Sequence, residues 1–142
     1  MKAKFMTPRV GIGVLVCKDD SILLGQRKTY DGKEFWSVPG GHLDRMETFE
    51  SCGKKEVRRE TGLDVNEIEF FYATNNLSQG EKRSTHSVSI FMIAKYESGE
   101  PVVLNTEKCL ERKWFKRSDL PKDMSVWMKQ MVDKAEKPRF LK

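Results

Sequence analysis

The stretch that decides the fold is GHLDRMETFESCGKKEVRRETGL, residues 41–63. Its second half predicts a helix that begins after Thr48, a favourable N-cap residue, and continues to about Thr61. Glu50 in the first turn suits the positive end of the helix dipole. Gly62 then supplies the left-handed residue that commonly ends a helix. The stretch therefore predicts a loop that leads directly into a helix.

Two glutamates, Glu56 and Glu60, share one face of this helix because they are four residues apart, about 6 Å along the axis. Carboxylate oxygens are ligands that Mg²⁺ and Mn²⁺ prefer. Mg²⁺ usually takes one or two protein carboxylates and leaves its other positions to water and phosphates. The pair fits such an ion. On its own, it fits equally a solvated helix face, with Glu56 paired to Arg58 or Arg59 and Glu60 to Lys55.

The frame around this pair, Gly-x5-Glu-x7-Lys-Glu-Val-x2-Glu-x-Gly-Leu, resembles the box of the Nudix hydrolase family, G-x5-E-x7-R-E-U-x-E-E-x-G-U, where U is aliphatic. The positions in register are Gly41, Glu47, Glu56, Val57, Glu60, Gly62 and Leu63. The resemblance implies the α/β class and a Nudix fold, with a mixed β-sheet sandwiched between α-helices. It also implies a catalytic site in which Glu56 and Glu60 bind Mg²⁺, for which Mn²⁺ can substitute.

Two positions depart from the family box. Lys55 replaces an arginine and can still form the supporting salt bridge to Glu47, although without a bidentate fork. Arg59 replaces a glutamate that is a further metal ligand in many relatives. The change implies fewer bound ions or weaker metal affinity, and alternatively a contact between Arg59 and a substrate phosphate.

Short motifs outside the box, over roughly residues 9–121, are similar to the MutT-like nucleoside triphosphate diphosphatases, a subgroup that includes the vertebrate enzyme acting on thiopurine nucleotides. This resemblance implies hydrolysis of nucleoside triphosphates, including oxidised or modified deoxynucleotides, to a nucleoside monophosphate and pyrophosphate. It implies substrate contacts at Gly41 and His42. It also makes Glu107 a metal ligand or catalytic base, the alternative being an exposed loop residue.

Further substrate contacts are candidates by position. Arg27 and Lys28, near the end of the second expected strand, are either phosphate contacts or ordinary charges of an edge strand. Phe35, Trp36 and Phe91 are candidates for stacking a base, and each is as well suited to the core.

The family likeness leaves other functions open. The chain could hydrolyse a nucleotide sugar, ADP-ribose or the 5′ end of an RNA, and less favoured is a Nudix-fold binding module that has lost catalysis. The net charge of +5 and the pI of about 9.1 favour an anionic partner without separating a small nucleotide from RNA.

Composition indicates one domain over residues 1–142, with 38% hydrophobic and 33% charged residues. No apolar run approaches the roughly 20 residues needed to cross a bilayer, and no signal peptide is recognised, so we expect a cytoplasmic protein without a membrane partner. Three separated cysteines, Cys17, Cys52 and Cys109, predict reduced, mostly buried thiols and no zinc site. The sequence leaves a homodimer open.

The remaining elements follow from periodicity and turn residues. We expect strands at residues 10–17, 22–27, 35–38, 68–73, 86–96 and 111–116, and a helix at residues 124–134. Residues 75–85 are polar and predict a loop. In the last helix the apolar residues are spaced i, i+3, i+4, i+7 and i+8 and predict a face in the core; they are Met124, Trp127, Met128, Met131 and Val132.

Overall fold

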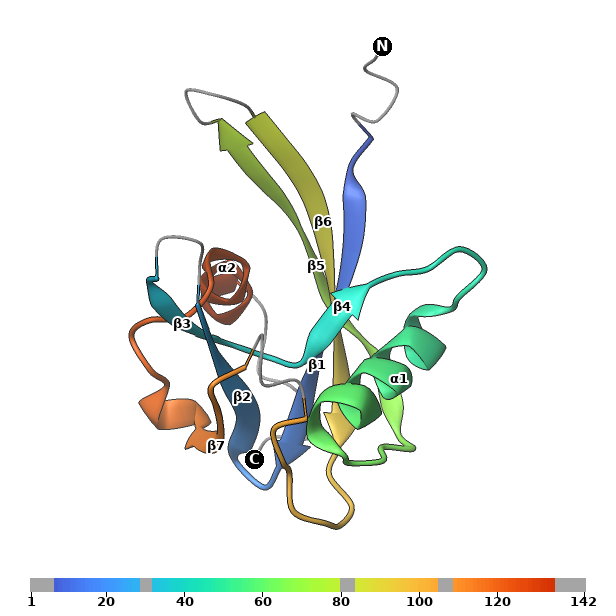
Figure 1. Ribbon diagram of the computed structural model, residues 1–142, viewed down its shortest axis with the longest axis vertical. Helices are drawn as coiled ribbons and strands as arrows, with labels where there is room; N and C mark the ends of the chain where they lie inside the picture. Colours follow the sequence, from blue (N-terminus) through green and yellow to red (C-terminus); the bar gives the residue numbers. More distant parts are fainter. Residues whose placement is uncertain (1–6, 29–31, 80–83, 105–108, 135–142) are drawn as a thin grey trace.

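The computed structural model describes residues 7–28, 32–79, 84–104 and 109–134, and within these ranges the chain forms a seven-stranded sheet (Figure 1). The strands are β1 (Arg9–Lys18), β2 (Ser21–Lys28), β3 (Glu34–Ser37), β4 (Gly40–His42), β5 (Ile68–Gln79), β6 (Ser84–Lys95) and β7 (Glu111–Lys116). Their order is β3-β2-β1-β6-β5, with β4 also paired to β1 and β7 to β2. Because β1 and β6 are parallel and their other neighbours antiparallel, the sheet is mixed, as predicted.

Helices cover both faces of the sheet. They are α1 (Phe49–Thr61) and α2 (Val126–Lys134), and a short 3-10 helix, η2 (Arg117–Asp119), follows β7. Alternate residues of β1 point to opposite faces. On one face Val14 and Val16 pack with Val57 of α1, and on the other Leu15 packs with Met128 of α2. The sheet is therefore sandwiched between helices, as the family resemblance implies.

The two ends of α1 lie where the sequence predicts them. The Thr48 side chain accepts a hydrogen bond from the Ser51 N–H at 3.1 Å. Gly62 adopts the left-handed conformation with φ 78°, and its N–H donates to the Arg58 carbonyl at 3.0 Å. Both caps satisfy backbone groups that a helix end would leave without partners. They fix which residues of the box are helical, and so which face carries Glu56 and Glu60.

The sheet divides between β1 and β2. These strands pair only beside the turn that joins them, at Cys17–Ile22 and Lys18–Ser21. Away from this turn, β2 pairs with β3 and β7, and β1 pairs with β4 and β6. The chain crosses from one half to the other between β3 and β4. Residues of this crossing therefore lie between the two halves of the sheet.

The expected loop at residues 75–85 is wrong for residues 75–79, 84 and 85, because β5 continues to Gln79 and β6 begins at Ser84 (Figure 1). Residues 80–83 lie outside the described residues. The pairs Asn76–Ser87 and Leu77–His86 extend the antiparallel ladder. Polar side chains do not prevent this pairing, since the ladder satisfies the backbone and cross-strand polar contacts add to it. The Asn76 amide donates to the Ser87 and Ser89 hydroxyls at 3.2 and 2.7 Å.

The expected core face of α2 is correct only in part. Met128 and Met131 are buried, whereas Trp127 and Val132 are each 37% exposed. A spacing of i, i+3, i+4 predicts an apolar stripe along the helix. How much of this stripe is buried depends on how the helix lies on the sheet.

The three cysteines are free and buried, as predicted. Burial raises the pKa of the Cys17 and Cys52 thiols to about 12, so both stay protonated at neutral pH. Within the ranges given above, no helix is long and apolar enough to cross a membrane.

Replacing Thr48 with alanine should lower the free energy of unfolding by about 1 kcal/mol, because the Ser51 N–H loses its acceptor. Thr48→Ser keeps the hydroxyl and should stay close to the wild type. Urea denaturation of the three proteins measures the difference. An equal loss in both variants would mean that the threonine methyl group, and not the cap, carries the effect.

Candidate active site

A cleft of about 460 Å³ lies where the two halves of the sheet diverge. It is lined by β1, β4, one face of α1, the polar ends of β5 and β6, and the start of α2. Its lining includes Gly41, His42, Glu56, Arg59, Glu60 and Trp127. Most of these residues lie in one short stretch of sequence, residues 41–60, and the fold brings the other strands and α2 beside them.

Glu56 is a buried carboxylate in this lining, with a side chain 3% exposed. It lies against β4: a Cβ atom built on Gly41 would be 2.7 Å from Glu56 Cδ, closer than real contacts allow. A side chain at the first glycine of the box would therefore displace the Glu56 carboxyl group. A carboxylate this deeply buried needs positive partners. Its burial argues against the alternative that Glu56 lies on a solvated helix face.

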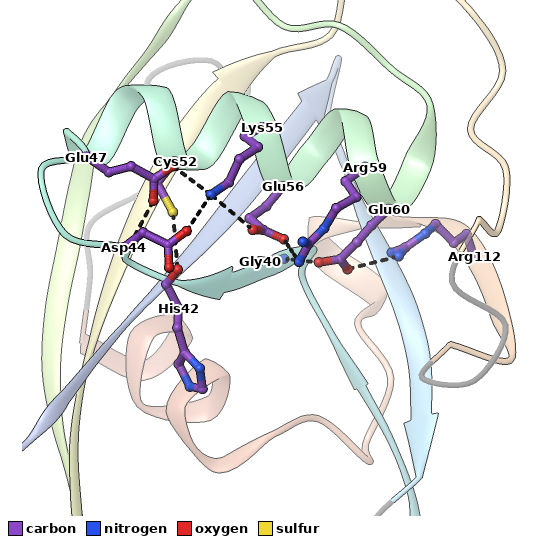
Figure 2. A network of polar contacts seen from close by, with 10 residues as sticks. All are labelled: Gly40, His42, Asp44, Glu47, Cys52, Lys55, Glu56, Arg59, Glu60 and Arg112. Carbon is purple, nitrogen blue, oxygen red and sulfur yellow. Dashed lines mark hydrogen bonds and ion pairs between the residues drawn. The ribbon is translucent and has the colours of Figure 1, made fainter. Parts of the chain in front are cut away.

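Glu60 is held by donors from two different elements (Figure 2). Its Oε2 accepts from the Gly40 N–H at 3.3 Å, and its Oε1 accepts from Arg112 Nη2 at 3.2 Å. Burial raises the pKa of the Glu60 carboxyl, while the charges of Arg112 and Arg27 act in the opposite direction. The contacts orient the carboxylate and leave it in the lining of the cleft.

Sequence reasoning missed Arg112, whose side chain is only 3% exposed. It lies on β7 directly opposite Gly25 of β2. A Cβ atom at Gly25 would come within 2.6 Å of Arg112 Nη1 and 2.9 Å of Cys109 Sγ. The absence of a side chain at Gly25 therefore makes room for the arginine. A glycine inside an apolar strand indicates a close approach of this kind, although not its partner.

The supporting salt bridge of the box is present, as predicted. Lys55 Nζ lies 2.6 Å from Glu47 Oε2 and 3.1 Å from Asp44 Oδ2 (Figure 2). The hydrogen bond from Lys55 lowers the pKa of Glu47, and Glu47 also accepts from the Asp44 N–H at 2.9 Å. These contacts tie the loop before α1 to the second turn of the helix.

Arg59 points toward Glu56, and Nη2 lies 2.8 Å from Glu56 Oε1 (Figure 2). The Arg59 side chain is 64% exposed, so the guanidinium reaches from the cleft edge over a buried carboxylate. Its neighbour Arg58 points elsewhere and lies 2.6 Å from Asp64 at the surface. Arg59, one of the two residues that depart from the family box, is thus part of the site.

The remaining predicted residues divide into three groups. Arg27, Gly41 and His42 line the cleft together with the acidic pair. Lys28 is exposed and does not line it, since consecutive residues of a strand point to opposite sides. Glu107 lies outside the described residues, and its role as ligand or base stays a prediction.

One aromatic wall of the cleft was not expected. Trp127, at the start of α2, lines the cleft and meets Phe35 edge to face, with ring centroids 6.4 Å apart. Phe91, a stacking candidate from the sequence, also lines it but is 1% exposed. Trp36 packs against Phe115 in the core. Of the two rings that line the cleft, Trp127 is the exposed one.

The donor set fits Mg²⁺ or Mn²⁺. Within the part of the chain that the structure describes, no three His, Cys, Asp or Glu side chains gather as a closed metal cage. Glu56 and Glu60 are hard oxygen donors in one cleft, and hard cations that keep several waters need no more protein ligands than these two. Zinc, which prefers nitrogen and sulfur in a closed tetrahedron, fits the set poorly.

The whole region of fold and site matches one known family. Residues 7–135 match the family described as NUDIX domain. The chain belongs to the Nudix hydrolase family. The glycines, the acidic helix face and the salt bridge found above are the features that its box sequence encodes.

Several relatives are similar over most of this chain. The chain is 33% identical over 116 residues to the NAD-capped RNA hydrolase NudC of Photobacterium profundum, covering 80% of this chain and 41% of that protein. It is 29% identical over 118 residues to the ADP-ribose pyrophosphatase of Methanocaldococcus jannaschii, covering 83% and 68%. The chain thus spans less than half the length of the NudC relative.

Solved structures agree in fold. A MutT NUDIX hydrolase from Burkholderia pseudomallei superimposes with a TM-score of 0.79 at 26% identity, over 89% of this chain and 97% of that one. The NUDIX domain of Shewanella oneidensis NrtR, solved with ADP ribose, gives a TM-score of 0.71 at 18% identity, over 91% and 86%. The second likeness concerns the fold alone.

Gly41→Ala should displace Glu56 and weaken Mn²⁺ binding by about tenfold or more, because the added Cβ meets the carboxyl group. Gly11→Ala is a matched control: Gly11 also lines the cleft, but its Cβ would meet nothing closer than the Val88 carbonyl at 4.0 Å. Electron paramagnetic resonance of free Mn²⁺ measures binding, and circular dichroism checks the fold. Equal Mn²⁺ affinity in both variants would contradict the close approach.

Proposed function

We propose that this chain is a pyrophosphohydrolase that requires a divalent cation and cleaves the phosphoric anhydride bond of a nucleoside diphosphate derivative. The observation that carries the proposal is the pair Glu56 and Glu60, buried in the lining of a cleft to which Arg27 and Arg59 also contribute. Buried carboxylates beside arginines suit the joint binding of a hard cation and an anionic diphosphate.

The carboxylates and the arginines of the cleft would have different roles in the reaction. Glu56 and Glu60 would hold the cation, and Arg27 and Arg59 would contact phosphate oxygens, where arginine forms strong charge-assisted hydrogen bonds. A bound divalent cation polarises phosphoryl oxygens and favours ionisation of the attacking water. The water oxygen forms a bond to one phosphorus, and the bond from that phosphorus to the bridging oxygen breaks. The bridging oxygen leaves with the electron pair on the other phosphate, and the proton lost by the water passes to solvent or to that phosphate.

The substrate is a nucleoside diphosphate joined to a further group X. The resemblance to MutT-like enzymes favours nucleoside triphosphates, in which X is a phosphate. The names of the NudC and ADP-ribose pyrophosphatase relatives support NAD-capped RNA and ADP-ribose equally well. Trp127 supports a nucleobase at the α2 end of the cleft, because every base can stack on an indole. The diphosphate is common to all of these compounds.

A panel of substrates tests whether the chain hydrolyses a diphosphate and which of these compounds it accepts. Nucleoside triphosphates should give a monophosphate and pyrophosphate; ADP-ribose should give AMP and ribose 5-phosphate, and a NAD cap should release nicotinamide mononucleotide. Chromatography and phosphorus magnetic resonance identify the products. Cleavage of none of these compounds, with nucleotide binding intact, would instead favour a binding module.

Hydrolysis should stop after exhaustive chelation and return when Mg²⁺ or Mn²⁺ is added, because the described donors are oxygen atoms suited to these ions. Addition of Zn²⁺ should restore much less activity. Full turnover in the chelated protein would remove the cation from the proposal.

Glu60→Gln should lower turnover at least about a hundredfold, a loss of roughly 2.7 kcal/mol of transition-state stabilisation, because shape is kept and the ligand charge is lost. Glu50→Gln is the control, since Glu50 lies exposed in the first turn of the same helix. A Glu60→Gln protein that turns over at the wild-type rate would show that Glu60 has only a structural role.

A further inference from the structure

Glu56 and Glu60 already have cationic partners in the protein itself. Glu56 Oε1 lies 2.8 Å from Arg59, and its Oε2 lies 3.9 Å from Lys55 Nζ. Glu60 lies 3.2 Å from Arg112. A metal ion that approaches the site must therefore share or displace these cations, because like charges at such distances repel each other.

The described residues give the site no excess of negative charge. The arginines in or behind the cleft are Arg9, Arg27, Arg59 and Arg112, and the carboxylates that line it are Asp44, Glu56 and Glu60. A bare dication gains little in such a site, whereas a polyphosphate meets several guanidinium groups. A cation that arrives with a diphosphate brings its own negative charge.

Of the two arginines that hold the pair, Arg59 is the one that can leave. Arg112 is 3% exposed and hemmed in by Gly25 and Cys109, so its position is fixed by packing. Arg59 is 64% exposed and lies on the exposed side of α1 at the cleft edge. Its guanidinium can turn from Glu56 to an incoming phosphate without opening the core, since both positions are reached by rotation of exposed side-chain bonds.

We propose that Arg59 couples the binding of the cation to the binding of the diphosphate, so that the site takes up the metal–nucleotide complex in preference to either component alone. In the free protein Arg59 neutralises Glu56. When the complex binds, the cation replaces the guanidinium at Glu56, and the guanidinium moves to a phosphate oxygen. This inference rests on the proposed function, because it assigns the cation to Glu56 and Glu60.

The proposal predicts opposite effects on the two components when the charge of Arg59 is removed. In Arg59→Gln, Mn²⁺ alone should bind about tenfold more tightly, because its competitor at Glu56 is gone. A nucleotide alone should bind about tenfold more weakly, because a phosphate contact is gone. The enhancement of nucleotide binding by saturating Mn²⁺ should shrink accordingly, as coupling between two ligands is reciprocal.

Three titrations measure these effects: Mn²⁺ alone by electron paramagnetic resonance, the α,β-methylene analogue of ADP with chelator by calorimetry, and the same analogue with saturating Mn²⁺. The affinity of Mn²⁺ for the analogue in solution is the same for every variant and cancels in the comparison. Arg58→Gln is the matched control, since Arg58 is adjacent in sequence and paired with Asp64 at 2.6 Å, away from the cleft.

Each result decides something different. Opposite shifts in Arg59→Gln, with Arg58→Gln unchanged, support the coupling. Shifts in the same direction, no shift, or the same shifts in Arg58→Gln overturn it while leaving the proposed hydrolysis untouched. If Glu60→Gln leaves Mn²⁺ affinity at the wild-type value, the ion binds elsewhere, and the proposed function fails together with the coupling.

Discussion

The close approach of α1 to β4 is the constraint on which the site depends. A Cβ atom at Gly41 would overlap the Glu56 carboxyl, and one at Gly40 would overlap the Ile12 carbonyl of β1. Farther along the interface, a Cβ at Gly53 would lie 2.8 Å from the Ile68 side chain. Glycines on both surfaces let the helix lie close enough to the sheet for Glu56 and Glu60 to line a cleft while remaining buried.

The close packing of α1 buries the carboxylates of Glu56 and Glu60, so that each needs a partner of opposite charge or a hydrogen-bond donor. Burial of an unpaired carboxylate is costly, and here the partners come from separate elements: Arg59 from α1 itself, Arg112 from β7 and the Gly40 N–H from β4. These contacts join the two halves of the divided sheet at the site. The packing of α1 against the sheet therefore also sets the geometry of Glu56 and Glu60.

The departure at position 59 changes the character of the site. Where the family box carries a further glutamate beside the positions of Glu56 and Glu60 on the helix, this chain carries a guanidinium that faces the same cleft. The change moves the local charge balance toward anion binding while leaving Glu56 and Glu60 in place. Under the proposed function, a basic protein gains from this balance, since electrostatic attraction concentrates an anionic substrate at the cleft.

The sequence by itself determined the α1 segment, its caps and its acidic face, because these follow from local propensities and spacing. Its resemblance to the family box added the Glu47–Lys55 salt bridge and the mixed sheet. The tertiary structure alone decided that Arg112 reaches Glu60, that Trp127 faces the cleft and that Lys28 does not. It also extended β5 and β6 through a polar stretch in which composition favours a loop. Each of these outcomes depends on which strands are neighbours and how a helix lies across them, and a pattern along one chain does not carry that information.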